Sequence, residues 1–147
     1  MKDQEYLDKV CEALRSFQML EEGLKIYIGL YVEVERLSGN RDENLDSLIK
    51  DIFNTPLSYV IKRFKKTNPN GAIVSRLDRK DLIEWRNFLA HNAFHHEFMS
   101  RASARNFSYH TALDIAKVAL DIGYLTLDLG EEIIILQRRH ASLLAGS

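Results

Sequence analysis

Residues 3–37, DQEYLDKVCEALRSFQMLEEGLKIYIGLYVEVERL, decide the fold class of this chain of 147 residues. Apolar side chains recur there every three or four residues, which is the spacing of one face of an α-helix. They are Tyr6, Leu7, Val10, Leu14, Phe17, Leu20, Leu24, Ile28, Tyr31 and Val34. The stretch predicts one long helix or two collinear helices. Gly23 and Gly29 each cost a helix about 1 kcal/mol relative to Ala, so we expect a neighbour to pack closely there.

Shorter helical segments follow. A polar loop over residues 38–44 precedes a short amphipathic helix at 45–53. Thr55 and Pro56 suit the N-cap and the first position of the next helix, which ends at 65–67. The apolar residues of that helix are Leu57, Val60, Ile61 and Phe64. The turn signal Asn68-Pro69-Asn70-Gly71 and a linker come after it.

Two further helices complete the chain. One begins at Leu77 or Asp78 and extends to about Met99, and the other is capped by Ser108 and extends to about Leu144. The last helix carries on one face Leu113, Ala116, Leu120, Leu127 and Ile134. Because no alternating β pattern occurs, the sequence predicts an all-α protein. We expect a single domain over residues 1–147, an antiparallel bundle of four principal helices with one short additional helix.

Composition and cysteine content indicate a cytoplasmic protein. The apolar segment 115–136 contains five charged residues, so we expect a buried bundle helix and no membrane partner. The first ten residues lack the apolar core of a signal peptide. Cys11 is the only cysteine, which excludes an intramolecular disulfide and favours a reducing compartment. We expect its thiol to be buried.

Charge is unevenly distributed along the chain. Residues 1–60 hold 12 acidic and 7 basic residues, 61–110 hold 4 and 10, and 111–147 hold 5 and 3. A basic strip on a nearly neutral protein is typical of a surface that binds phosphates. The residues predicted to bind nucleic acid are Lys62, Arg63, Lys65, Lys66 and Arg105. The alternative is a solvated helix end that the helix dipole favours.

The segment Glu84-Trp85-Arg86-Asn87-Phe88-Leu89-Ala90-His91 carries the strongest chemical signal. At about 100° per residue, Arg86, Asn87 and His91 fall within an arc of about 140° on a helix. Arg supplies a permanent planar fork for anionic oxygens, and His exchanges protons near neutral pH. Asn adds a neutral donor and acceptor that can orient a hydroxyl group. The three residue types together suit phosphate chemistry.

This arrangement resembles the HEPN domain, the higher-eukaryote and prokaryote nucleotide-binding family. The signature of that family is Arg, four to six residues, then His, commonly with Asn directly after the Arg. The segments Thr55-Pro56-Leu57 and Leu20-Glu21-Glu22-Gly23-Leu24-Lys25 resemble segments that precede the motif in small bacterial members. The similarity covers about residues 15–140. A second Arg-Asn-x3-His copy spans 105–110, across a predicted loop and cap.

The resemblance implies a metal-independent endoribonuclease that has no cofactor and acts on RNA. It assigns Arg86, Asn87 and His91 as catalytic residues, with Glu22 and His95 as supporting candidates. His91 would act as general acid or base on the ribose 2′-hydroxyl, Arg86 would stabilise charge on phosphorus, and Asn87 would position the scissile group. Cyclic 2′,3′-phosphate ends would result.

The resemblance also implies a biological setting and partners. Many members of the family are toxins or phage-defence effectors, and some have a partner antitoxin that modifies a Tyr two residues after the His. Ala93 stands at that position here, which argues against that subgroup. We expect a homodimer packed through the motif-bearing helix, with Phe94 and Phe98 as contacts.

Other interpretations of the same residues stay open. The protein could be a non-catalytic HEPN-like module that binds nucleotides or a protein and serves as a dimerisation scaffold. Arg86 and Asn87 could instead belong to a buried polar network. His91 and His95 stand one helical turn apart, but neither an HExxH pattern nor a cysteine pair supports zinc, so we expect no metal. We expect Trp85, Phe88 and Phe94 to be core residues rather than base-stacking platforms.

Overall fold

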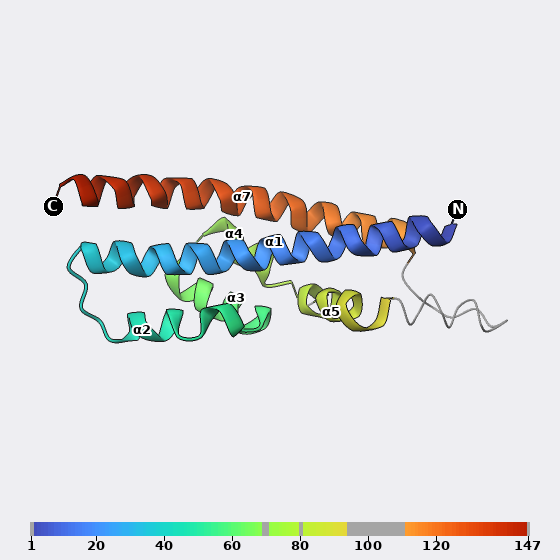
Figure 1. Ribbon diagram of the computed structural model, residues 1–147, viewed down its shortest axis with the longest axis horizontal. Helices are drawn as coiled ribbons and strands as arrows, with labels where there is room; N and C mark the ends of the chain where they lie inside the picture. Colours follow the sequence, from blue (N-terminus) through green and yellow to red (C-terminus); the bar gives the residue numbers. More distant parts are fainter. Residues whose placement is uncertain (1, 69–70, 80, 94–110, 147) are drawn as a thin grey trace.

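The computed structural model describes residues 2–68, 71–79, 81–93 and 111–146 (Figure 1). Over these residues the chain is helical and contains no strand, which confirms the predicted all-α helical bundle. The helices are α1 (Lys2–Leu37), α2 (Asn44–Ile49), α3 (Leu57–Thr67), α4 (Ala72–Leu77), α5 (Asp81–Asn87) and α7 (Ala112–Ala145). A 3₁₀ turn, η1 (Ile52–Asn54), follows α2, and a π-helical turn, η2 (Phe88–Asn92), continues α5.

The two long helices α1 and α7 pack side by side and run in the same direction (Figure 1). Gly23 of α1 lies against Leu129 of α7. Ten residues further along α1 and eleven further along α7, Glu33 Oε2 lies 3.2 Å from His140 Nε2. This parallel pairing differs from the antiparallel arrangement that the short loops suggest. The reason is that the segments between them carry the chain back along α1, so α7 begins again beside the N-terminus.

The apolar stripe predicted for residues 3–37 forms the centre of the core. Of its ten members, Leu7, Leu14 and Tyr31 are half-buried and the other seven are buried. An ideal Cβ at Gly23 would come within 2.9 Å of Leu129 Cδ2, so the close packing predicted there is confirmed. At Gly29 no neighbour from the described part of the chain lies within 4 Å of an added Cβ, so the close packing predicted there is not found. The apolar residues predicted for α3 are all buried as well.

One face of α7 differs from the prediction of a buried helix. The side chains that face the core are Ile115, Val118, Ala119, Ile122, Leu125, Leu129 and Leu136. The stripe of Leu113, Leu120, Leu127 and Ile134 lies on the opposite side and is exposed. Helical periodicity alone does not choose between two apolar faces of one helix. None of the described helices has the length and hydropathy needed to cross a membrane.

The structure corrects four further predictions, two of which concern helix caps. Thr55 does not cap α3, because its hydroxyl donates to the Asp51 carbonyl at 2.7 Å and Pro56 occupies the N-cap. Thr111, not Ser108, caps α7, with Asp114 completing a capping box. The region after Gly71 is not a linker, because α4 buries three apolar side chains there. Cys11 is exposed rather than buried, because Val10 occupies the buried side of α1 and the next residue points away from it.

Two phenylalanines test this assignment of the core. Phe64 is fully buried, with its ring 5.0 Å from that of Tyr27, whereas Phe53 is 86% exposed. We expect Phe64→Ala to lower the free energy of unfolding by about 3 to 5 kcal/mol, because it removes apolar contacts and leaves a cavity. Phe53→Ala is the matched control and should change it by less than about 0.5 kcal/mol. Urea denaturation measures both values, and similar losses for the two variants would contradict the described packing.

Candidate functional site

The segment α5–η2 is anchored to the core by one side. Leu82, Leu89 and Ala93 are buried, and Trp85 and Phe88 are half-buried against the core. The Trp85 and Phe88 rings are 5.9 Å apart and nearly perpendicular, a favourable edge-to-face arrangement. The prediction that these two aromatic residues belong to the core is therefore confirmed.

Charged side chains fix the start of α5 to α7. Arg79 Nη2 lies 3.0 Å from Asp81 Oδ2, and Arg79 Nη1 lies 3.4 Å from Asp121 Oδ2 on α7. The hydrogen bond from Arg79 holds the pKa of the Asp81 carboxyl below its ordinary value. An ionised carboxylate in the first turn of a helix also interacts favourably with the helix dipole. The first turn of α5 is thus held in place before the site residues begin.

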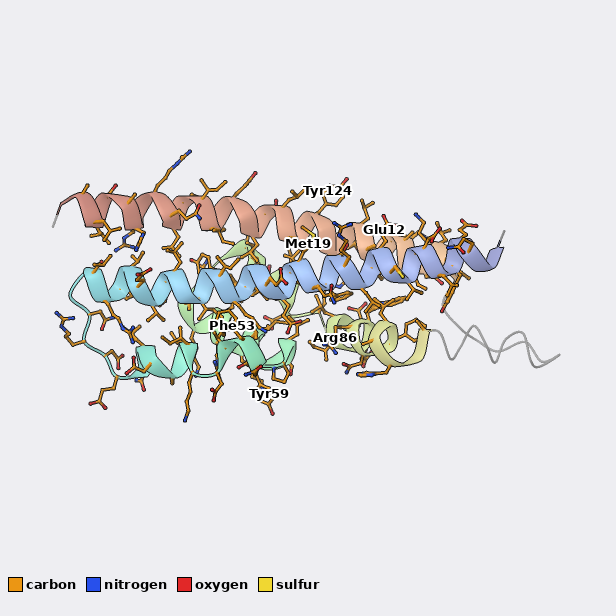
Figure 2. All side chains as sticks on the ribbon, viewed as in Figure 1. Glu12, Met19, Phe53, Tyr59, Arg86 and Tyr124 are labelled. Carbon is orange, nitrogen blue, oxygen red and sulfur yellow. The ribbon has the colours of Figure 1, made fainter. Side chains whose placement is uncertain are left out.

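Two members of the predicted trio, Asn87 and His91, face solvent, as does the small residue Ala90 between them in sequence. Arg86, labelled in Figure 2, is half-buried. The structure therefore brings the three side chains onto one accessible stretch of helix, as the spacing predicts. Their exposure excludes a buried polar network around Asn87 and His91. Within the described part of the chain, Arg86 makes no ion pair.

The π-helical turn lies within the Arg-Asn-x3-His motif. The Ala93 N–H donates to the Phe88 carbonyl five residues back, instead of four as in an α-helix. A regular α-helix would place Arg86 and His91 about 140° apart around the axis. The wider turn advances less per residue, so it moves His91 toward the side that Arg86 occupies. Turns of this kind are rare and frequently occur at functional sites.

A buried hydroxyl from α1 holds the end of the π turn. Tyr6 Oη donates to the Ala93 carbonyl at 2.9 Å, across 87 residues of sequence. Sequence reasoning assigned Tyr6 only to the apolar stripe, and no local signal distinguishes its hydroxyl from that of any other core tyrosine. This hydrogen bond couples the geometry of the motif to the first helix of the chain.

Glu22 does not lie beside the trio. Since Tyr6 contacts Ala93 and α5 runs antiparallel to α1, Glu22 lies further along α1 than Arg86 does (Figure 1). Glu22 is exposed, and the neighbouring Lys25 donates to the carbonyl of Phe53 in η1. The second supporting candidate, His95, is outside the described residues. So are Arg105, the whole second motif copy, Phe94 and Phe98.

The basic strip on α3 is partly used for intramolecular contacts. Arg63 Nη1 donates to the carbonyls of Leu48, at 3.2 Å, and Lys50, at 2.7 Å, which satisfies groups left unpaired at the end of α2. Lys65 pairs with Asp78. Lys62 and Lys66 are exposed, and the Lys62 ammonium lies 5.2 Å from the centre of the Tyr59 ring. Two of the four lysine and arginine side chains are therefore available to an external anion.

Metal-binding groups and similarity to known proteins are the remaining indications of function. Within the described ranges, no three His, Cys, Asp or Glu side chains are grouped so that they could bind a metal ion. Neither family models, nor curated proteins, nor solved structures give a match to this chain.

The exposure of the trio predicts how substitutions affect stability. Asn87→Ala and His91→Ala should each change the free energy of unfolding by less than about 0.5 kcal/mol, since both side chains face solvent. Leu89→Ala, on the buried side of the same turn, should lower it by about 2 to 5 kcal/mol. Thermal and urea denaturation measure these differences. A loss above 1 kcal/mol in either polar variant would show that the trio stabilises the fold.

Proposed function

We propose that the chain is a metal-independent endoribonuclease that cleaves RNA by attack of a ribose 2′-hydroxyl on the adjacent phosphate. The observation that carries the proposal is that the half-buried Arg86 and the exposed Asn87 and His91 share one helical segment that contains a π turn. An open, exposed site suits a polymeric substrate better than a small molecule, which generally binds in a concave pocket. The proposed setting is cytoplasmic, as a toxin or phage-defence effector with a regulatory antitoxin as partner.

Each member of the trio has a role that matches its chemistry. His91 accepts the proton of the 2′-hydroxyl, whose oxygen forms a bond to phosphorus while the bond to the 5′-oxygen breaks. The leaving 5′-oxygen takes up a proton, so the products are a cyclic 2′,3′-phosphate and a 5′-hydroxyl. Arg86 stabilises the charge that builds on the non-bridging oxygens, and Asn87 orients the reacting group. All steps use protons and protein charges only.

One observation favours a different class of function. Catalytic histidines are commonly oriented by a third group, and no described residue forms a hydrogen bond to His91. A non-catalytic module that binds a nucleotide or a protein through Arg86 and Asn87 would not need such a group. The two functions differ in a simple way, because only the nuclease changes the covalent structure of RNA.

Cleavage assays in EDTA test the nuclease directly. We expect the purified protein to cut RNA without metal and to leave cyclic phosphate ends. His91→Ala should reduce the rate by about 10²- to 10⁴-fold, since it removes the proton acceptor. Arg86→Ala should reduce it by about 10²- to 10³-fold, by analogy with lost oxyanion donors. Initial rates on labelled RNA and end-group analysis give both results.

Arg41→Ala is the matched control for this assay, because Arg41 is an exposed arginine in the loop between α1 and α2. Its rate should equal that of the unchanged protein. RNA with a single 2′-deoxyribose at the cut site should resist cleavage, since the nucleophile is missing. Cleavage of the deoxy substrate, or full activity of the His91 variant, would remove the nuclease assignment. RNA binding without cleavage would support the binding module.

The two exposed lysines of α3 predict a salt-dependent contribution to RNA binding. Replacing Lys62 and Lys66 together by Ser should weaken binding and reduce the slope of log affinity against log salt by about 1.4, at about 0.7 for each lost phosphate contact to a single strand. Arg63→Ser is the contrasting variant, which should lower thermal stability because it leaves the carbonyls of Leu48 and Lys50 without their donor. An unchanged slope in the double variant would mean that RNA does not contact this helix end.

A further inference from the structure

A row of exposed apolar side chains runs along α7 on the side that faces away from the core. Leu113, Leu120, Leu127 and Ile134 stand seven residues apart, and Tyr124 lies beside them. Between 48% and 68% of each of these residues is exposed. We call these five residues the α7 stripe. A repeat of seven residues is typical of helices that pack against another helix along their whole length.

The α7 stripe continues onto α1 across a groove. The groove has a volume of about 510 Å³, and Glu12 of α1 and Ala116, Leu120 and Gly123 of α7 are among its lining residues. Figure 2 shows Glu12 and Met19 at the boundary between the two helices. Met19 and Ile26 follow Glu12 at intervals of seven residues, and both are more than half exposed. The apolar surface therefore covers adjacent sides of both long helices.

Packing among the described residues does not explain two glycines within α7. A Cβ built on Gly123 or Gly130 would meet no described atom from outside its own stretch of helix within 4 Å, whereas one built on Gly23 would press on Leu129. Glycine weakens a helix relative to alanine, so its presence in mid-helix needs a reason such as a close neighbour. Gly123 lines the groove, and Ala116, Gly123 and Gly130 recur with the same spacing of seven as the leucines. Small residues in such a row permit another helix to approach closely.

The α7 stripe is symmetric about its midpoint. Leu113, Leu120, Leu127 and Ile134 are centred between Gly123 and Tyr124. Two copies of α7 that run antiparallel about a twofold axis at this point would place Leu120 opposite Leu127 and Leu113 opposite Ile134. A twofold interface must be self-complementary in this way, because each copy contributes the same residues.

The charged residues on this face of α7 favour an antiparallel orientation of the two helices. Lys117 and Glu131 are exposed on the same side of α7, seven residues on either side of Tyr124. An antiparallel pair brings Lys117 of one copy close to Glu131 of the other. A parallel pair would instead place the two Lys117 side chains opposite each other, and likewise the two Glu131 side chains, and such like-charge pairs are unfavourable.

The exposed area is sufficient for a stable interface. The exposed parts of the α7 stripe, Met19 and Ile26 amount to about four whole side chains. That is on the order of 700 Å², at roughly 150 to 200 Å² for each large side chain. A standard protein interface buries about 800 Å² on each partner, whereas the largest apolar patch of a monomer is about 300 to 600 Å².

We propose that the α7 stripe is the interface of a homodimer in which two α7 helices pair antiparallel about an axis between Gly123 and Tyr124. This interface lies on α7 and α1, not on the motif-bearing helix that the sequence suggested. It does not depend on the nuclease proposal, because its tests measure mass and cross-linking rather than activity.

Light scattering and sedimentation equilibrium test the interface at micromolar concentration. We expect the unchanged protein to have twice the mass of the 17.0 kDa chain. Leu127→Glu should raise the dimer dissociation constant at least about 100-fold, since each dimer loses two leucines and gains two charges at its centre. Phe53→Glu is the control, because Phe53 is an exposed apolar residue that Figure 2 shows on the other side of α1 from α7, and it should leave the mass unchanged. Circular dichroism checks that each variant is folded.

The variant Gly123→Ala distinguishes a weakened dimer interface from a loss of folding. Because space around Gly123 is open within one chain, the added methyl group should strengthen the isolated helix and still weaken the dimer. A monomeric mass for the unchanged protein, or a dimer that tolerates both Leu127→Glu and Gly123→Ala, would overturn the proposal.

Engineered cysteines test the orientation. With the exposed Cys11 replaced by Ser, Gly123→Cys should form a disulfide with its own copy under mild oxidation. Leu113→Cys should not, because the antiparallel pair separates the two copies of residue 113 by roughly 30 Å along the axis. A mixture of Leu113→Cys and Ile134→Cys proteins should cross-link to each other. Self-linking of Leu113→Cys would show a parallel pair and contradict the proposed axis.

Discussion

The packing of Leu129 against Gly23 holds α7 against α1, and the position of every other element depends on this pair of long helices. A side chain at Gly23 would bring its Cβ within 2.9 Å of Leu129 Cδ2, so the absence of one allows the helices to approach. The segments α2 to α5 then cover the remaining apolar side of α1 (Figure 1). Tyr6, near the start of α1, reaches across to the end of the π turn. The site geometry is thereby set by helix packing far from it in sequence.

In the α5–η2 segment, the residues that stabilise the fold and the solvent-facing residues of the candidate site lie on different sides. Leu82, Leu89 and Ala93 bury the inner side, while Asn87 and His91 face solvent on the outer side. Such a division lets the outer residues change without loss of the fold. The π turn adds to this arrangement, because it shifts His91 relative to Arg86 while the buried residues keep their contacts. The proposed action on a long, flexible substrate such as RNA uses the exposed His91 imidazole and the half-buried Arg86 guanidinium of this fixed segment.

The sequence predicted the inner face of α1 and α3 well, because apolar residues on one side of a helix leave little choice about which side is buried. It failed for α7, where Leu113 and Leu120 compete with Ile115 and Ile122, and only the packing of α1 decides between them. The helix α4 and the π turn had no local signal, since both depend on tertiary contacts. The shared helical segment of Arg86, Asn87 and His91 followed from their spacing in the sequence. Their distance from Glu22 did not, because it depends on how α5 lies along α1.

We propose that Arg86, Asn87 and His91 act together on an RNA phosphate. A titration of isotope-labelled protein with a short 2′-deoxy oligonucleotide, followed by two-dimensional NMR of backbone, arginine and imidazole signals, tests this claim most directly, because the ligand binds without being cut. We expect the largest shifts at Arg86, Asn87 and His91, with smaller shifts at Lys62 and Lys66. Shifts that leave the three residues unchanged, or that fall on α7 instead, would contradict it.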